Sequence, residues 1–171
     1  MTTEPGSRRP KIEDIGSYSE IEADVQARSA RIAWATVATV DRKGRPRTRI
    51  LHPIWETVDG KPVGFIATDR GSHKGKHLAQ NPNVSVSYWD QAHEQMYVDA
   101  VAEWVDDAAE KRRVWDLFKN TPPPLGYDPV MIWPGGPDAP SFGVLKLTPW
   151  RVELFSLGDM FAGKAPRVWR G

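Results

Sequence analysis

The chain has 171 residues, of which 40% are hydrophobic, and this is enough for one domain with a substantial core. The 23 Lys and Arg residues nearly balance the 22 Asp and Glu residues, and the net charge of +1 argues against nucleic acid or an anionic membrane as a partner. The absence of cysteine excludes disulfides, thiolate metal sites and a cysteine nucleophile.

The distribution of apolar residues predicts a soluble protein. No apolar run approaches the roughly 20 residues that a membrane helix needs. The N-terminal residues are polar and charged, and they lack the apolar core of a secretory signal peptide. Because a chain without cysteine also suits a reducing compartment, we expect a cytoplasmic location.

The N-terminal half predicts a tail, a helix and a run of strands. Residues 1–16 contain nothing periodic to bury, so they predict a disordered tail before a single domain at residues 17–171. Ser17 and Glu20 form a capping-box pattern for a helix over residues 18–30. From their β-branched and aromatic residues and the turns between them, strands are predicted at residues 32–40, 45–56 and 62–68.

The C-terminal half predicts two helices, a long loop and further strands. The helices cover residues 72–80 and 108–120, and a loop rich in proline and glycine covers residues 121–141. Strands are predicted at residues 84–89, 95–105, 142–147 and 150–155, before a polar C-terminal tail. Since the strands follow one another mainly as hairpins, we expect a mainly β fold, a six- to seven-stranded antiparallel β-barrel with short flanking helices.

Two basic motifs are candidates for an anion site. The first is a row of arginines that alternate along the second predicted strand and therefore share one face: Arg45, Arg47 and Arg49. Ser72 and Lys74 form the second, where a helix N-terminus would add free N–H groups to a hydroxyl and a charge. Together they would hold one anionic group, for which a phosphate fits best. The alternative is a solvated strand face and a simple N-cap.

The histidines and the glycines point to no other chemistry. His73 and His77 have the spacing of metal ligands, but no carboxylate completes a site and the neighbouring lysines would repel a cation, so no metal is expected. His52 and His93 have no serine and acid placed for a triad, and we interpret both as structural histidines with satisfied hydrogen bonds. Neither a dinucleotide-binding nor a P-loop glycine motif is present.

The order and spacing of four segments resemble the pyridoxamine 5′-phosphate oxidase-like family of FMN-binding split β-barrels. The segments are residues 35–51, Phe65-Ile-Ala-Thr68, Ser72-x-Lys74 and residues 78–86. The true oxidase carries a basic residue a few positions beyond the arginine of the second strand, whereas this chain continues as His52-Pro-Ile-Trp55 and also ends differently. The resemblance therefore implies a divergent, stress-protein-like or actinobacterial member instead of an enzyme of vitamin B6 oxidation.

The resemblance implies a homodimer with FMN bound at its interface. The implied cofactor-binding residues are Arg47, Thr48, Arg49, Ile50, Leu51, Thr68, Ser72, His73, Lys74 and Trp169. Arg49 and the turn from Ser72 to Lys74 would hold the phosphate, with Thr68 beside it. The backbone of residues 48–51 would face the flavin ring, Arg47 or Arg49 would stabilise the reduced ring, and Trp169 would approach it.

Several functions remain open at this stage. The first is an FMN-dependent oxidoreductase of an unknown small molecule, in which residues 121–141 would cover a flat apolar substrate. The second is an F420-dependent reductase on the same fold, because F420 also presents a phosphate. The third is a flavin-binding or stress protein without turnover. In the fourth, the barrel is empty and its cations are merely solvated.

Overall fold

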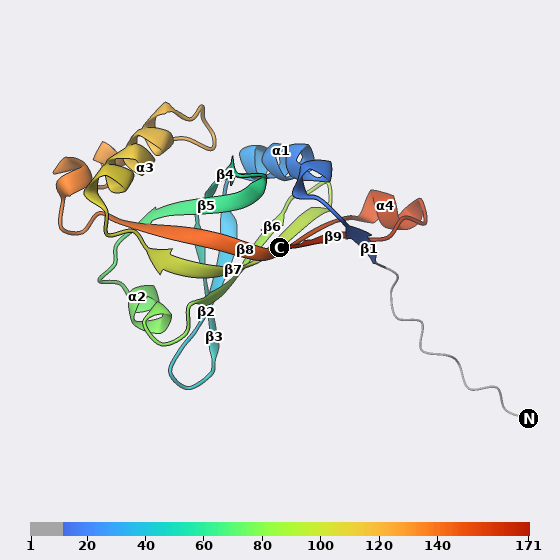
Figure 1. Ribbon diagram of the computed structural model, residues 1–171, viewed down its shortest axis with the longest axis horizontal. Helices are drawn as coiled ribbons and strands as arrows, with labels where there is room; N and C mark the ends of the chain where they lie inside the picture. The colour runs from blue at the N-terminus through green and yellow to red at the C-terminus, as the bar shows by residue number, and fades with distance from the viewer. Residues whose placement is uncertain (1–11) are drawn as a thin grey trace, which may run out of the picture.

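The computed structural model describes residues 12–171, which form a nine-stranded sheet surrounded by short helices (Figure 1). The strands are β1 (Glu13–Ile15), β2 (Ala35–Val40), β3 (Pro46–Leu51), β4 (Ile54–Val58), β5 (Lys61–Thr68), β6 (Asn83–Trp89), β7 (Glu94–Trp104), β8 (Gly143–Ser156) and β9 (Arg167–Arg170). The helices are α1 (Glu22–Ile32), α2 (His73–Leu78), α3 (Ala108–Asn120) and α4 (Leu157–Phe161), with 3-10 turns η1 (Tyr18–Glu20), η2 (Pro129–Met131) and η3 (Gly136–Asp138). The predicted mainly β fold is confirmed. In this part of the chain no helix is both long and apolar enough to cross a bilayer.

The strands form an incomplete barrel. Antiparallel ladders connect β3, β2, β6, β7, β8, β5 and β4 in that order, and β9 and β1 extend the sheet from the C-terminal half of β8. Among residues 12–171, β3 pairs only with β2 and β4 only with β5. The ring of strands is therefore open between Leu51, at the end of β3, and Ile54, at the start of β4. We call this opening the seam.

The seam corrects the prediction of one strand over residues 45–56. His52 and Pro53 interrupt that segment. The part before them, β3, pairs with β2, and the part after them, β4, pairs with β5. The physical reason is that Pro53 has no N–H group to donate to a ladder, so the strand cannot continue through it beside β2. The first hairpin is as predicted, because Asp41 and Gly44 close its turn and Gly44 has a φ of 75°.

The two predicted strands at residues 142–147 and 150–155 are one strand, β8. It runs through Pro149, and its register against β7 shifts between Asp99 and Ala100, which leaves Trp150 as an extra residue in a bulge. The N-terminal half of β8 pairs with β5 and its C-terminal half with β9. Since β8 changes neighbours along its length, the bend at Pro149 lets one strand serve both sides of the barrel.

Both predicted tails contain strands. Residues 13–15 of the expected disordered tail form β1, and the expected polar C-terminal tail contains α4 and β9. β1 pairs in parallel with β9, in the one parallel ladder recorded among residues 12–171. The remainder of the predicted tail, residues 1–11, lies outside the described residues. Neither strand is recognisable locally, because β9 is stable only beside β8 and β1 only beside β9.

Two hydrophobic clusters hold the domain together. The first fills the barrel and includes Val37, Val86 and Leu147, all at most 2% exposed. The second lies between β5, β8 and α3, and there Val114 and Phe118 contact Leu125 and Trp133 of the loop at residues 121–141. That loop is thus anchored to the domain by its large side chains.

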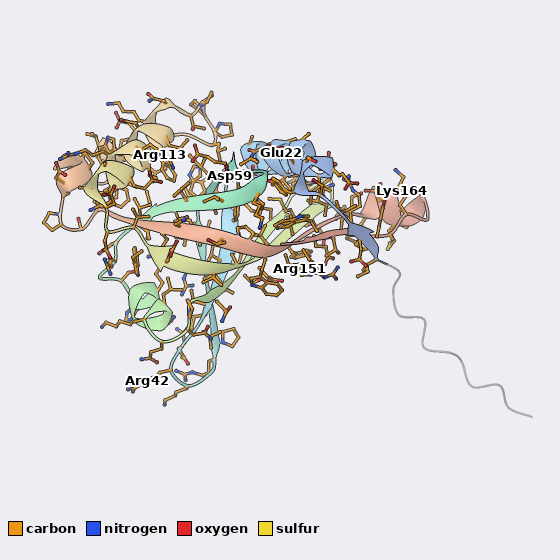
Figure 2. The ribbon with its side chains drawn as sticks, viewed as in Figure 1. Glu22, Arg42, Asp59, Arg113, Arg151 and Lys164 are labelled. Carbon is orange, nitrogen blue, oxygen red and sulfur yellow. The ribbon has the colours of Figure 1, made fainter. Side chains whose placement is uncertain are left out.

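Many surface cations are paired with acids (Figure 2). Arg113 lies 2.9 Å from Glu56 and 2.8 Å from Glu110, and Arg151 lies between Asp99 and Glu153. The first arginine of the predicted row, Arg45, also belongs to this group, because it binds Asp41 at 2.8 Å in the hairpin turn. A lysine or arginine without a neighbouring carboxylate is therefore a candidate for binding an anionic ligand.

Candidate functional site

Arg49 of β3 is held at the edge of the barrel interior. The ladder places Arg47 opposite Thr39 and Arg49 opposite Val37, which confirms that alternate residues of this strand share a face. The guanidinium of Arg49 donates to Thr39 Oγ1 at 2.8 Å and to the Val37 carbonyl at 3.2 Å. These two bonds fix a half-buried guanidinium and leave other N–H donors available for a ligand.

Lys74 approaches the same site from α2. Its Nζ donates to Ser72 Oγ at 2.8 Å, and that hydroxyl donates to the Asp69 carbonyl at 2.7 Å. Ser72 therefore occupies the N-cap position without capping the helix through its side chain. Since α2 has only six residues, its dipole adds little, and the attraction for an anion comes from the side chains.

Gly75 allows the α2 turn to fold tightly. A Cβ at this position would lie 2.0 Å from the Arg70 carbonyl oxygen, which is far inside van der Waals contact. Only glycine permits this approach of α2 to the loop that follows β5. The central glycine of Ser72-His-Lys-Gly-Lys-His77 thus has a structural role in presenting Ser72 and Lys74.

The electrostatics of the two cations indicate an anion site. Burial lowers the pKa of Lys74, and the positive charge of Arg49 lowers it further, with Asp69 opposing both effects. Burial and the charge of Arg47 likewise lower the pKa of Arg49. Within residues 12–171, no carboxylate lies within salt-bridge distance of Arg47, Arg49 or Lys74. A bound anion would offset both the repulsion between these cations and the free energy cost of burying them.

Two residues of the site were missed at the sequence level. Thr39 Oγ1 accepts from Arg49 and lies 2.9 Å from His77 Nδ1, so it connects β3 to α2. Thr39 is 2% exposed. As a polar residue in register with the inward-facing Ala35 and Val37 of β2, it could have been identified from the sequence as a candidate. His77, for which the sequence predicted neither a metal nor another role, is a partner of Thr39. Its position three residues after Lys74 places it on the same side of α2.

The structure distributes the other predicted residues over several places. Thr68 is buried at the end of β5, opposite Gly143 and four residues before Ser72. His73 is exposed and faces the β2–β3 hairpin turn across a groove lined by Asp41 and Arg45. The side chain of Thr48 is exposed, on the opposite face of β3 from Arg49.

Trp169 does not join this cluster. It is 4% exposed in β9, within the barrel core, and its ring meets Tyr18 edge-on with centroids 5.5 Å apart. Core side chains enclose the Trp169 ring, and its approach to a flavin ring stays a prediction. Nothing in the sequence around Trp169 distinguished a position in the core from a contact with a ligand.

Ile50 and Leu51 lead from the basic cluster to an apolar pocket of about 370 Å³ at the seam. The residues that line this pocket are Trp34, Ile50, Leu51, His52, Ala67, Pro124, Tyr127, Met131 and Ile132. Four of them belong to the loop at residues 121–141, which supports the prediction that this loop covers an apolar site. We call it the seam pocket.

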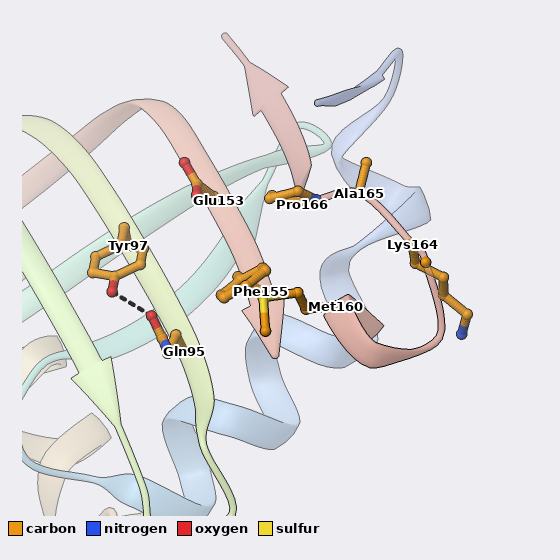
Figure 3. A pocket seen from close by; sticks show the side chains of 9 residues that line it. Gln95, Tyr97, Glu153, Phe155, Met160, Lys164, Ala165 and Pro166 are labelled. Atoms are coloured by element: carbon orange, nitrogen blue, oxygen red, sulfur yellow. Dashed lines mark hydrogen bonds between the residues drawn. The ribbon is translucent and has the colours of Figure 1, made fainter. Parts of the chain in front are cut away.

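A second pocket lies elsewhere and contains none of the predicted residues. It has a volume of about 590 Å³ between β7, β8 and the segment after α4 (Figure 3). Figure 3 shows that Tyr97 and Gln95, which line it, are already hydrogen-bonded to each other. With these polar groups satisfied, the Arg49–Lys74 cluster and the seam pocket remain the best candidate site.

Comparison with known proteins identifies the family. The family model described as pyridoxamine 5′-phosphate oxidase matches residues 21–156, which is most of the chain. The protein therefore belongs to the pyridoxamine 5′-phosphate oxidase family. A pyridoxine/pyridoxamine 5′-phosphate oxidase of Vibrio parahaemolyticus is 40% identical over 105 residues, which cover 59% of this chain and 48% of the relative. The chain thus matches about half of the length of that enzyme.

Solved structures with the same fold are more distant in sequence. A Clostridium acetobutylicum protein related to general stress protein 26 has a TM-score of 0.62 at 18% identity, covering 80% of this chain and 87% of its own. An FMN-binding protein of Nostoc punctiforme has a TM-score of 0.58 at 18% identity, covering 84% and 86%. A protein described as an F420 reductase has a TM-score of 0.51 at 18% identity, covering 74% and 94%. These likenesses establish the fold.

Proposed function

We propose that the protein is an FMN-binding oxidoreductase that acts on a small molecule. The observation that carries the proposal is the pair of half-buried cations, Arg49 and Lys74, which have no carboxylate in salt-bridge distance among residues 12–171. Burial lowers the pKa of both groups, and the charge of Arg49 lowers that of Lys74 further. A phosphate monoester would satisfy both. Membership of the pyridoxamine 5′-phosphate oxidase family makes the phosphate of FMN the first candidate.

Each residue of the cluster would have a separate task. Arg49 would donate its free N–H groups to phosphate oxygens, and Lys74 would add a second positive charge. The Ser72 hydroxyl would turn from the Asp69 carbonyl to donate to a phosphate oxygen. The exposed Arg47 is the candidate for stabilising negative charge on the reduced ring. When bound, the flavin would supply hydride or electron transfer, and the protein would orient it and exclude water.

The first test is identification of the bound cofactor. We expect the purified protein to carry FMN, seen as flavin absorption and by the mass of the released chromophore. Arg49→Met and Lys74→Met should each lower FMN affinity, whereas Arg42→Met should not, because Arg42 lies at the tip of the β2–β3 hairpin (Figure 2). Equal affinity in all three variants would contradict the proposed phosphate site.

A second candidate cofactor is the deazaflavin F420. It is favoured by the fold that this chain shares with the F420 reductase. The cation pair would hold a phosphate of either cofactor, so direct competition is the test. Protein freed of its cofactor should bind FMN and F420 with different affinities in matched fluorescence titrations. Preferential binding of F420, together with substrate reduction that depends on F420, would replace the first proposal.

A flavin-binding protein without turnover is the third possibility, and reduction kinetics distinguish it. For an oxidoreductase we expect the bound flavin to be reduced by a physiological donor such as NAD(P)H and then reoxidised by an acceptor. A flavin that is bound tightly but exchanges electrons with no donor and no acceptor would favour a role in storage, sensing or protection.

We further propose that the protein is a homodimer, as the family resemblance implies. Val101 of β7 and Trp150 of the β8 bulge are neighbours on the outer face of the sheet and are 42% and 48% exposed. Large apolar side chains that are exposed together are typical of an interface. Light scattering should give twice the monomer mass, and Val101→Glu should shift it toward the monomer. A wild-type monomer at micromolar concentration would contradict this proposal.

A further inference from the structure

The seam pocket contains a buried histidine without a hydrogen-bond partner. His52 is 7% exposed, and neither ring nitrogen makes a well-aligned hydrogen bond among residues 12–171, although the Leu125 backbone lies near enough to raise its pKa. This corrects the expectation of a satisfied structural histidine. A buried polar group without a good hydrogen bond is destabilising, so its presence at the wall of a cavity indicates a role for a ligand.

Aromatic rings surround His52 and give the pocket its shape. The ring centroids of Trp34 and Tyr127 lie 4.7 and 5.3 Å from that of His52, and Phe118 lies 6.3 Å away. The pocket volume of about 370 Å³ is in the range of small-molecule sites. The aromatic rings of Trp34 and Tyr127 in the lining favour a flat ligand, because planar rings stack in offset or edge-on geometry.

The composition of the walls defines the charge of the ligand. None of the nine lining residues is Asp, Glu, Lys or Arg. Burial lowers the pKa of His52, with the Leu125 backbone opposing part of the shift, so the imidazole is neutral near pH 7. A neutral imidazole offers one donor, which suits a hydroxyl or a carbonyl oxygen, and one acceptor, which suits a hydroxyl group. An ionic ligand would find no counter-charge here.

The mouth of the pocket is also apolar. Trp34, Ile50, Met131 and Ile132 line it and are between 58% and 81% exposed. Exposed apolar side chains gathered at one cavity are costly in water, and an apolar ligand would cover them. Ile50 and Leu51 connect this cavity to β3, whose next inward residue toward the phosphate cluster is Arg49.

We propose that the seam pocket binds a neutral, planar aromatic molecule bearing a hydroxyl or carbonyl oxygen, and that His52 recognises that oxygen by a hydrogen bond. The inference deepens the proposed function by naming the substrate class, but binding itself requires no cofactor. The pocket lies at the end of the segment expected to face the flavin ring, so such a ligand would lie beside the ring. His52 is then a specificity-determining residue.

The test compares two ligands that differ by one hydroxyl, 2-naphthol and naphthalene. Calorimetry or ligand-observed NMR gives their affinities for the protein with and without saturating FMN. We expect wild type to bind 2-naphthol roughly tenfold more tightly, which corresponds to one hydrogen bond of about 1.4 kcal/mol. His52→Phe keeps an aromatic ring and should bind both ligands equally, whereas the control His93→Asn, outside the pocket, should retain the difference.

A second measurement covers the case in which His52→Phe does not fold. In the wild-type protein, the imidazole ¹⁵N resonances of His52 should shift on addition of 2-naphthol and not of naphthalene. Absence of binding by either ligand, or a preference for 2-naphthol that persists without His52, would overturn the proposal. Competition between FMN and 2-naphthol would also overturn it, since the flavin ring would then fill the pocket. Binding of 2-naphthol by a protein that takes no flavin would support this inference and reject the proposed function.

Discussion

Replacing Lys74 by methionine should separate ligand binding from stability. Lys74 is half-buried beside Arg49, so its charge is poorly tolerated without a bound anion. Methionine keeps a long apolar side chain and removes the charge. We expect a variant that folds as well as wild type without cofactor and binds FMN much more weakly.

The magnitudes follow from the contacts of Lys74. Its loss removes one hydrogen bond, the 2.8 Å contact with Ser72 Oγ, which contributes about 1 kcal/mol. Relief of the burial and of the repulsion from Arg49 offsets this cost. The free energy of unfolding should therefore change by less than about 1 kcal/mol. Loss of a charge-assisted bond to phosphate, about 1.5–3 kcal/mol, should raise the Kd for FMN roughly 10- to 150-fold.

Arg49→Met provides the matched contrast. Arg49 also binds Thr39 Oγ1 and the Val37 carbonyl, so its removal should cost about 1–3 kcal/mol of stability as well as affinity for FMN. Urea denaturation of cofactor-free protein gives the stability, and quenching of flavin fluorescence gives the Kd. Destabilisation by Lys74→Met of more than about 2 kcal/mol, with an unchanged Kd for FMN, would refute the reasoning, because Lys74 would then be structural.

Three further changes test other parts of the structure. The pKa of His52 in the folded protein lies below its ordinary value of 6.5, so below pH 6.5 the unfolded chain binds one more proton than the folded chain. As the pH falls to 5, wild type should therefore lose up to about 1.4 kcal/mol more stability per pH unit than His52→Phe, measured by urea denaturation. Trp169→Ala, in the barrel core, should lower stability by about 3–5 kcal/mol in the same assay and leave the Kd for FMN unchanged. A large rise in the Kd for FMN without a loss of stability would indicate that Trp169 contacts the cofactor. Gly75→Ala should destabilise the protein by about 1–3 kcal/mol and weaken FMN binding. A Cβ added at Gly44 would have no atom within 4 Å, so the control Gly44→Ala should affect only stability, through its positive φ.

Local signals were sufficient where an element is specified by its own residues. The helix at residues 108–120 has the predicted bounds because Asp107 caps it and Val114, Trp115 and Phe118 repeat on one face. The first hairpin was equally readable, since Asp41 and Gly44 fix its turn. Arg49, Ser72 and Lys74 were predicted to hold one anion, because a strand face and a helix N-terminus both carry cations there.

Long-range pairing decided what the sequence did not show. Whether residues 45–56 form one strand or two depends on the partner of β4, and β9 is a strand only because β8 and β1 accept it. The same applies to Trp169, whose burial depends on Tyr18 from the other end of the chain. Residue type and local periodicity are properties of neighbouring residues, but strand partners are chosen by distant ones.

The seam pocket is the clearest product of tertiary structure. The sequence by itself determined a mainly β domain, a basic phosphate-binding candidate and a loop suited to cover an apolar site. It did not predict that Trp34, His52 and Tyr127 would meet, because they come from three segments joined only by folding. The break at His52-Pro53 opens the barrel, and the loop anchored on α3 covers the opening with Tyr127 and aliphatic side chains. A hydrogen-bonding need left unmet by that packing becomes visible only in three dimensions.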